Sequence, residues 1–207
     1  MKRLAACFLG SLLALAAAPA SATPITFGGT LGGATETPPN ASPGFGVMQV
    51  VIDPAAHTLD VSVIFNNLVG LTTASHIHCC TLAPFTGSAG VATEVPTFAN
   101  LPLGVTSGSF TQSFDTLLDS TYNPAFEAAN GGTAAGAEAA LFAGIMGGEA
   151  YLNIHTDQFP GGEISGFLFP LVCDGPNGAC TAAEPATLSL LGMGLFGAFS
   201  WRRRRST

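Results

Sequence analysis

Three of the four histidines fall in two short segments with the alternating pattern of β-strands. His76 and His78 stand one residue apart in Ala-Ser-His-Ile-His, and His155 follows Tyr-Leu-Asn-Ile. Successive side chains of a strand point to opposite faces, so His76 and His78 share one face. If the two segments pair as neighbouring strands, His155 joins that face. Neutral imidazoles suit copper or zinc, so His76, His78 and His155 form a hypothetical metal site.

Two polar residues are expected to support this face. Asn153 has the same strand parity as His155, and Glu163 follows the turn Pro-Gly-Gly. Histidine, asparagine and glutamate can also form a hydrogen-bonded cluster that fixes the register of the strands without a metal. Both interpretations are open at this point. The opposite side of these strands is expected to line the core with three isoleucines, Ile77, Ile154 and Ile164.

Residues 1–22 have a charged start and an apolar run, which predicts a secretory signal peptide, and Cys7 lies within it. Four cysteines remain in the exported chain, and an even number there favours disulfides. These four residues are Cys79, Cys80, Cys173 and Cys180. Four cysteines allow three pairings. One joins the two adjacent cysteines to each other and closes the short loop between the other two. The others tie the adjacent pair to the C-terminal loop through both bonds.

The elements that must position these residues are short apolar segments separated by turn residues, a pattern that favours an all-β sandwich. The expected strands cover residues 25–31, 45–53, 58–66, 74–79, 108–114, 151–156 and 163–169. His57 lies in the turn between two of them and is expected to be solvated. Residues 120–148 are Ala-rich with apolar residues at helical spacing, which predicts one short helix before the penultimate strand.

All six Lys and Arg residues lie near the two ends of the chain, whereas the 13 Asp and Glu residues give a net charge of −7. The segment between Arg3 and Arg202 therefore has no fixed positive charge. Binding to nucleic acid requires cations against phosphates, so this class of partner is excluded. Anionic small substrates are disfavoured for the same reason.

The two ends have the composition of targeting segments. Residues 1–22 combine a charged start, an apolar run and a small-x-small site, which predicts a secretory signal peptide. The tail, residues 183–207, has Ala-Glu-Pro, an apolar run and an arginine cluster, marked by Glu184, Pro185, Arg202, Arg203, Arg204 and Arg205. It resembles the PEP-CTERM sorting signal, with Ala183 in place of the first proline. The resemblance implies an exosortase-type processing enzyme as a partner and transient membrane anchoring.

The blocks 31–46, 74–78 and 150–168 together resemble the CHRD domain, over about residues 25–170. In the last block Ser165 and Phe167 stand where the family usually has arginine and glutamine. The resemblance implies an immunoglobulin-like or Greek-key β-sandwich. Residues 171–182 then form a Cys-containing linker loop before the tail.

The first functional hypothesis is a non-enzymatic module of the cell surface or extracellular matrix. Its partners would be envelope proteins or exopolysaccharide. The alternative is a copper- or zinc-binding protein. The His-x-His strand with a distant third histidine also resembles the copper ligands of Cu/Zn superoxide dismutase. That enzyme needs further zinc ligands and an arginine, and an acidic domain repels superoxide, so dismutase activity is not expected.

Overall fold

The computed structural model describes residues 23–173 and 180–182. The predicted signal peptide, residues 1–22, and the sorting tail, residues 183–207, lie outside these residues. Among the described residues, no helix is long and apolar enough to cross a membrane.

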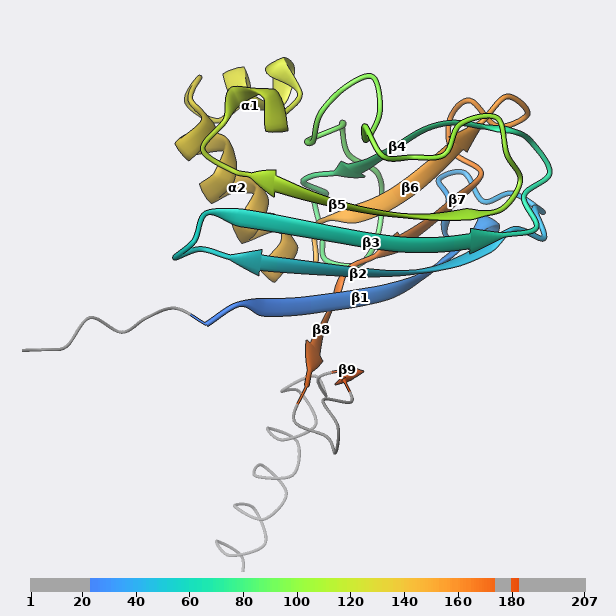
Figure 1. The fold of residues 1–207 in the computed structure, drawn as a ribbon, viewed down its shortest axis with the longest axis horizontal. Coiled ribbons are helices and arrows are strands. Elements are labelled where there is room, and N and C mark those ends of the chain that lie inside the picture. Colours follow the sequence, from blue (N-terminus) through green and yellow to red (C-terminus); the bar gives the residue numbers. More distant parts are fainter. Residues whose placement is uncertain (1–22, 174–179, 183–207) are drawn as a thin grey trace, which may run out of the picture.

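The described residues form a single antiparallel sheet of nine strands, which confirms the predicted all-β class. The strands are β1 (Ile25–Gly32), β2 (Phe45–Asp53), β3 (Thr58–Asn66), β4 (Thr72–His78), β5 (Gly108–Asp115), β6 (Tyr151–Thr156), β7 (Ile164–Phe167), β8 (Phe169–Val172) and β9 (Thr181–Ala182). They follow the order β4-β6-β7-β1-β2-β3-β5, and β8 pairs with β1 and β9. The sheet curls, so that β6 and β7 pass behind β5 and β3, with β4 next to β6 (Figure 1).

Strict alternation explains why the long strands form and which faces they bury. In β2 and β3 every second residue is buried, and Val50, Ile52, Leu59 and Val61 are fully covered. Burying one such aliphatic side chain stabilises the fold by about 1.5–3 kcal/mol. Phe98 packs against two aromatic rings of β5 and donates a backbone hydrogen bond to β4, so it links the two ends of the strand order.

Two helices occupy the region where one was predicted: α1 (Pro124–Ala129) and α2 (Ala134–Met146). Asn123 and Thr133 cap their N-termini by accepting backbone hydrogen bonds. Gly131 and Gly132 have φ of +99° and +68°, a backbone conformation that interrupts the helix and separates the two. The strand that follows, β6, is not penultimate. Leu168 divides the expected 163–169 strand into β7 and β8, and β9 is added.

The outer edge of β4 is covered by residues 89–98, which we call the edge segment. The backbone N–H groups of Ser75 and Ile77 donate to the hydroxyls of Thr97 and Thr93 at 3.0 Å. Backbone N–H groups of the edge segment donate in turn to the carbonyls of Ser75 and Ile77. This covering satisfies backbone groups that an edge strand would otherwise expose.

Candidate metal centre

The two histidine-bearing strands are neighbours, which meets the condition on which the three-histidine hypothesis depends. β4 pairs antiparallel with β6, with His76 opposite Asn153 and His78 opposite Tyr151. His155 lies opposite Ala74 on the same strand pair. The core side is as expected, because all three isoleucines are fully buried: Ile77, Ile154 and Ile164.

The three imidazole rings converge on one small volume. One ring nitrogen from each of His76, His78 and His155 lies within 4.8 Å of the other two. The ring centroids are 5.4–6.0 Å apart. Nitrogens around one tetrahedral zinc are roughly 3.4 Å apart, given metal–nitrogen bonds of about 2.0–2.1 Å. Ring movements of about 1 Å would therefore bring all three nitrogens onto one ion.

Each ring is oriented by a backbone carbonyl outside its own strand. His76 is held through Nε2 at 2.7 Å, and His78 and His155 are held through Nδ1 at 2.9 Å. The carbonyls belong, in the same order, to Pro96, Ala89 and Pro160. A carbonyl can only accept, so these nitrogens carry the hydrogen in the neutral rings. The opposite nitrogen of each ring then keeps a lone pair, as in metal-ligating histidines.

The lone-pair nitrogens have no donor to satisfy them. Nδ1 of His76 and Nε2 of His155 are buried and have no hydrogen-bond partner. Nε2 of His78 lies 3.0 Å from Oδ1 of Asn153. A neutral ring has one N–H and cannot donate both to this oxygen and to the Ala89 carbonyl. A cation among the three rings would therefore complete interactions that the protein alone leaves open.

The electrostatic environment keeps these rings neutral. Burial, assisted by the two neighbouring histidines and opposed by the hydrogen bond to Pro96, lowers the pKa of His76 to about 4. Burial also lowers the pKa of His78 and of His155. Neutral imidazole is the form that binds a metal ion, so the site needs no deprotonation at neutral pH.

The two residues that were expected to support the histidine face, Asn153 and Glu163, lie in different surroundings. Asn153 is 2% exposed and contacts His78. The Glu163 carboxylate is instead bound by four donors from other parts of the chain: the hydroxyls of Ser42 and Thr156 and the N–H groups of Val69 and Gly70. These hydrogen bonds outweigh the effect of burial and lower the pKa of Glu163. Glu163 therefore joins loops to β6 and does not support the histidine face.

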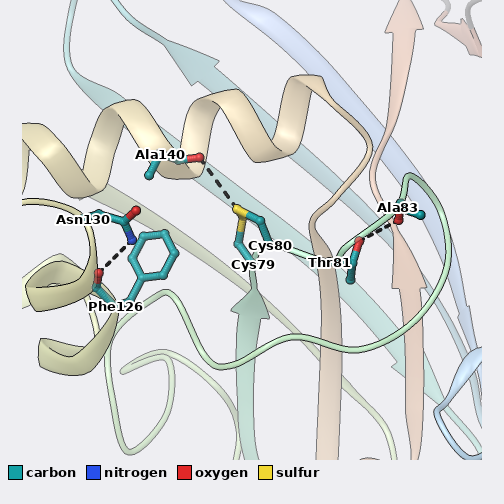
Figure 2. The surroundings of a disulfide bond; sticks show 7 residues. All are labelled: Cys79, Cys80, Thr81, Ala83, Phe126, Asn130 and Ala140. Atoms are coloured by element: carbon teal, nitrogen blue, oxygen red, sulfur yellow. Dashed lines mark hydrogen bonds between the residues drawn. A yellow bond between two sulfur atoms is a disulfide. The ribbon is translucent and has the colours of Figure 1, made fainter.

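The structure resolves the choice of disulfides that the sequence left open. Cys79 is bonded to Cys80, and Cys173 is bonded to Cys180. Figure 2 shows the first pair lying directly beneath α2, where the Cys80 sulfur is 3.8 Å from the Ala140 carbonyl oxygen. A methyl group on Gly144 of α2 would collide with both sulfur atoms. The bonded sulfurs are unavailable as thiolate ligands, which leaves the histidines as the donor set.

His57 occupies the turn between β2 and β3, as predicted, and its side chain is 44% exposed. It is nevertheless not simply solvated. Its Nδ1 donates to the carboxylate of Glu138 on α2 at 2.9 Å, and Thr116 donates to the same carboxylate at 3.1 Å. The fourth histidine thus anchors a helix to a turn, away from the three-histidine cluster.

One residue that sequence reasoning missed lies beside the cluster. Glu36 is only 8% exposed, and its Oε1 is buried without a hydrogen-bond partner. It lines a cavity of about 180 Å³ together with His78 and Asn153. Burial raises the pKa of Glu36 to about 7, against a hydrogen bond from Ser165. A single carboxyl in a Pro-rich loop offers no spacing pattern that would have identified it.

The fold and the site define an all-β domain with a buried three-histidine face. A family model of the CHRD domain matches residues 27–168, so the chain belongs to the CHRD domain family. The model of the PEP-CTERM protein-sorting motif matches residues 184–205. This motif implies an exported, envelope-targeted protein recognised by exosortase-type processing. No curated protein and no solved structure matches the chain.

Proposed function

We propose that this protein is an exported CHRD domain that binds one copper or zinc ion through His76, His78 and His155. The observation that carries the proposal is the convergence of three ring nitrogens within 4.8 Å, two of the rings having a buried nitrogen without a partner. Buried polar atoms are rarely left unsatisfied unless a function requires it. Three histidines also leave one position of a four-coordinate ion for another ligand.

Copper is the expected preference of this donor set. Divalent copper exceeds zinc in affinity for nitrogen ligands generally, and no thiolate or carboxylate belongs to the cluster that would alter that order. The backbone carbonyls that hold the rings form the outer shell that orients metal-bound histidines.

The test is a titration of the purified protein with metal, monitored by calorimetry. Metal analysis after dialysis then measures how much metal the protein retains. Wild type should retain one equivalent of Cu²⁺ and bind Zn²⁺ more weakly. His78→Ala and His155→Gln should each lose at least 100-fold in affinity. The matched control is His57→Gln, which removes a histidine outside the cluster and should bind as wild type does. Retention of no more metal by wild type than by His78→Ala would sink the proposal.

A second candidate function is the non-enzymatic interaction module predicted from the sequence, acting among envelope proteins or exopolysaccharide. The supporting observation is an apolar strip on the outer face of β2 and β3. Phe45, Val47 and Ile64 are 52–56% exposed, and Val47 pairs with Ile64 across the strands. Replacing all three by threonine should release protein from the envelope fraction. Unchanged fractionation would count against this function and leave the metal proposal intact.

Sorting by the tail is tested separately. Deleting residues 184–207, which contain the matched sorting motif, should change the retention of the protein in the membrane fraction. The histidine variants should be sorted like wild type, since the motif lies outside the CHRD domain.

A further inference from the structure

The cavity beside the histidine cluster is lined in part by buried polar side chains. Its volume is about 180 Å³, and it is lined by Glu36, His78, Tyr151, Asn153, Ser165 and Phe167 among others. A water molecule occupies about 30 Å³ in the liquid, so the space accommodates a ligand of a few heavy atoms and little more. Drug-sized ligands occupy cavities of about 300–1,000 Å³ and would not fit.

Glu36 is the unusual member of this wall. The residue is more than nine-tenths buried, yet its Oε1 has no hydrogen-bond partner. Gly162 lies directly against it, and a Cβ at that position would come within 2.6 Å and 2.8 Å of the two carboxylate oxygens. The loop between β6 and β7 therefore leaves room for this carboxyl group beside the cavity. An unpaired buried acceptor is costly, and a hydrogen-bond donor in the cavity would relieve it.

His78 belongs both to the three-histidine cluster and to the lining of the cavity. Its ring stacks on Tyr151 with centroids 4.9 Å apart and planes 10° from parallel. Asn153, which touches Nε2 of His78, lines the cavity as well. A ligand in this cavity would therefore lie against Glu36 and against His78, the one member of the cluster that lines it.

The charge of the wall selects the class of ligand. The described residues contain no Lys or Arg, so no fixed cation attracts an anion into the cavity. The ionised form of Glu36 repels anions and accepts hydrogen bonds. A neutral molecule with an N–H or O–H group can donate a hydrogen bond to Glu36, and a separate lone pair on it can bind the ion held by the histidines.

We propose that this cavity binds a small, neutral, protic ligand that donates a hydrogen bond to Glu36 and presents a lone pair to the ion held by the histidines. The inference rests on the proposed metal site and adds its ligand class. The ligand would occupy the fourth position that three protein ligands leave open. Glu36 acts as a specificity-determining residue and does not bind the metal.

The experiment uses copper-loaded protein at about pH 8 and two probes, imidazole and azide. Binding of each probe is measured by absorption and electron paramagnetic resonance spectroscopy of the copper. Neutral imidazole carries one N–H and one lone pair on opposite sides of its ring, whereas azide is an anion without hydrogen. Wild type should bind imidazole more tightly than azide. Glu36→Gln removes the negative charge, so it should weaken imidazole binding about tenfold and strengthen azide binding.

A second pair of variants separates access from charge. Ser88→Trp places a large side chain at the exposed rim of the cavity and should abolish binding of both probes while copper is retained. The matched control is Ser109→Trp, at an exposed position of β5 outside the cavity lining, which should change neither the binding of the probes nor the retention of copper. Copper retention is measured by ultrafiltration in every sample, because free imidazole also competes for the metal.

The outcomes distinguish the two proposals. If wild type binds no copper, the metal site fails and the ligand proposal fails with it. If copper binds but neither probe changes its spectrum, only the ligand proposal is overturned. The same holds if Glu36→Gln leaves the ratio of imidazole to azide affinity unchanged, or if Ser88→Trp still admits both probes.

Discussion

The Glu163 carboxylate and the three-histidine cluster are both buried polar groups attached to β6 and its neighbours, but only the first is complete. Glu163 accepts four hydrogen bonds from donors in two loops and β6, and its pKa is lowered in spite of burial. The histidines have two buried nitrogens without partners, and burial lowers their pKa. A satisfied buried group stabilises a fold, whereas an unsatisfied one is a place for a ligand.

The largest expected effect comes from disturbing the complete group. Glu163→Ala leaves the buried N–H of Gly70 and the partly buried N–H of Val69 without their acceptor, so the free energy of unfolding should fall by about 3 kcal/mol. Urea denaturation of the metal-free protein measures this loss. Glu163→Gln keeps one acceptor oxygen and should lose less. A loss of less than about 1 kcal/mol for Glu163→Ala would show that the four hydrogen bonds to Glu163 do not stabilise the fold.

The next effect comes from completing the incomplete group. Copper at 100 times its dissociation constant should raise the free energy of unfolding by about 2.7 kcal/mol, because it binds the folded chain alone. Copper should not change the free energy of unfolding of His155→Gln, whereas it should stabilise His57→Gln as it stabilises wild type. Thermal melts with and without a chelator report the difference. Equal stabilisation of His155→Gln would place the metal elsewhere.

Acid should weaken the metal-free cluster. The ordinary pKa of histidine is about 6.5 in the unfolded chain, whereas that of folded His76 is about 4. The unfolded chain therefore binds more protons between these values, and the free energy of unfolding falls as the pH decreases through that range. The loss should be on the order of 3 kcal/mol, since one pKa unit corresponds to about 1.4 kcal/mol. Denaturation midpoints from pH 7 to pH 4 measure this loss. His76→Phe should reduce the slope of the free energy of unfolding against pH. An equal slope in the variant would show that protonation of His76 is not the cause of the loss of stability in acid.

The smallest expected effect is also the most discriminating. His76→Phe in the metal-free protein at pH 7 should change the free energy of unfolding by less than about 1 kcal/mol, since it replaces a partly unsatisfied ring by an apolar one. It should abolish metal binding at the same time. If this variant is instead as unstable as Glu163→Ala, the histidines are a structural network of the kind that the sequence also allowed.

The shared face of His76 and His78 was predictable because strand alternation is a local pattern. Their parity and the position of Ile77 follow from a period of two, whereas the pairing of their strand with β6 is a long-range contact that could only be assumed from the sequence. Family resemblance added the extent of the domain, and the matched family model agrees with it.

The rest depended on contacts between distant parts of the chain. Glu163 follows β6 closely in sequence, yet its partners Ser42, Val69 and Gly70 come from loops that no local pattern relates to it. Glu36 gained its importance from a cavity formed by several elements. The split between α1 and α2 was missed because the Ala-rich composition outweighed the two glycines between them.

The edge segment has a consequence for the behaviour of many copies together. An uncovered edge of β4 would offer N–H and C=O groups to a strand of another chain, which is how sheets begin to aggregate. Residues 89–98 occupy those groups with their own backbone and threonine hydroxyls. The same segment supplies the Ala89 and Pro96 carbonyls that hold two of the three rings. Detaching it would therefore open an aggregation-prone edge and disorganise the histidine cluster in a single event.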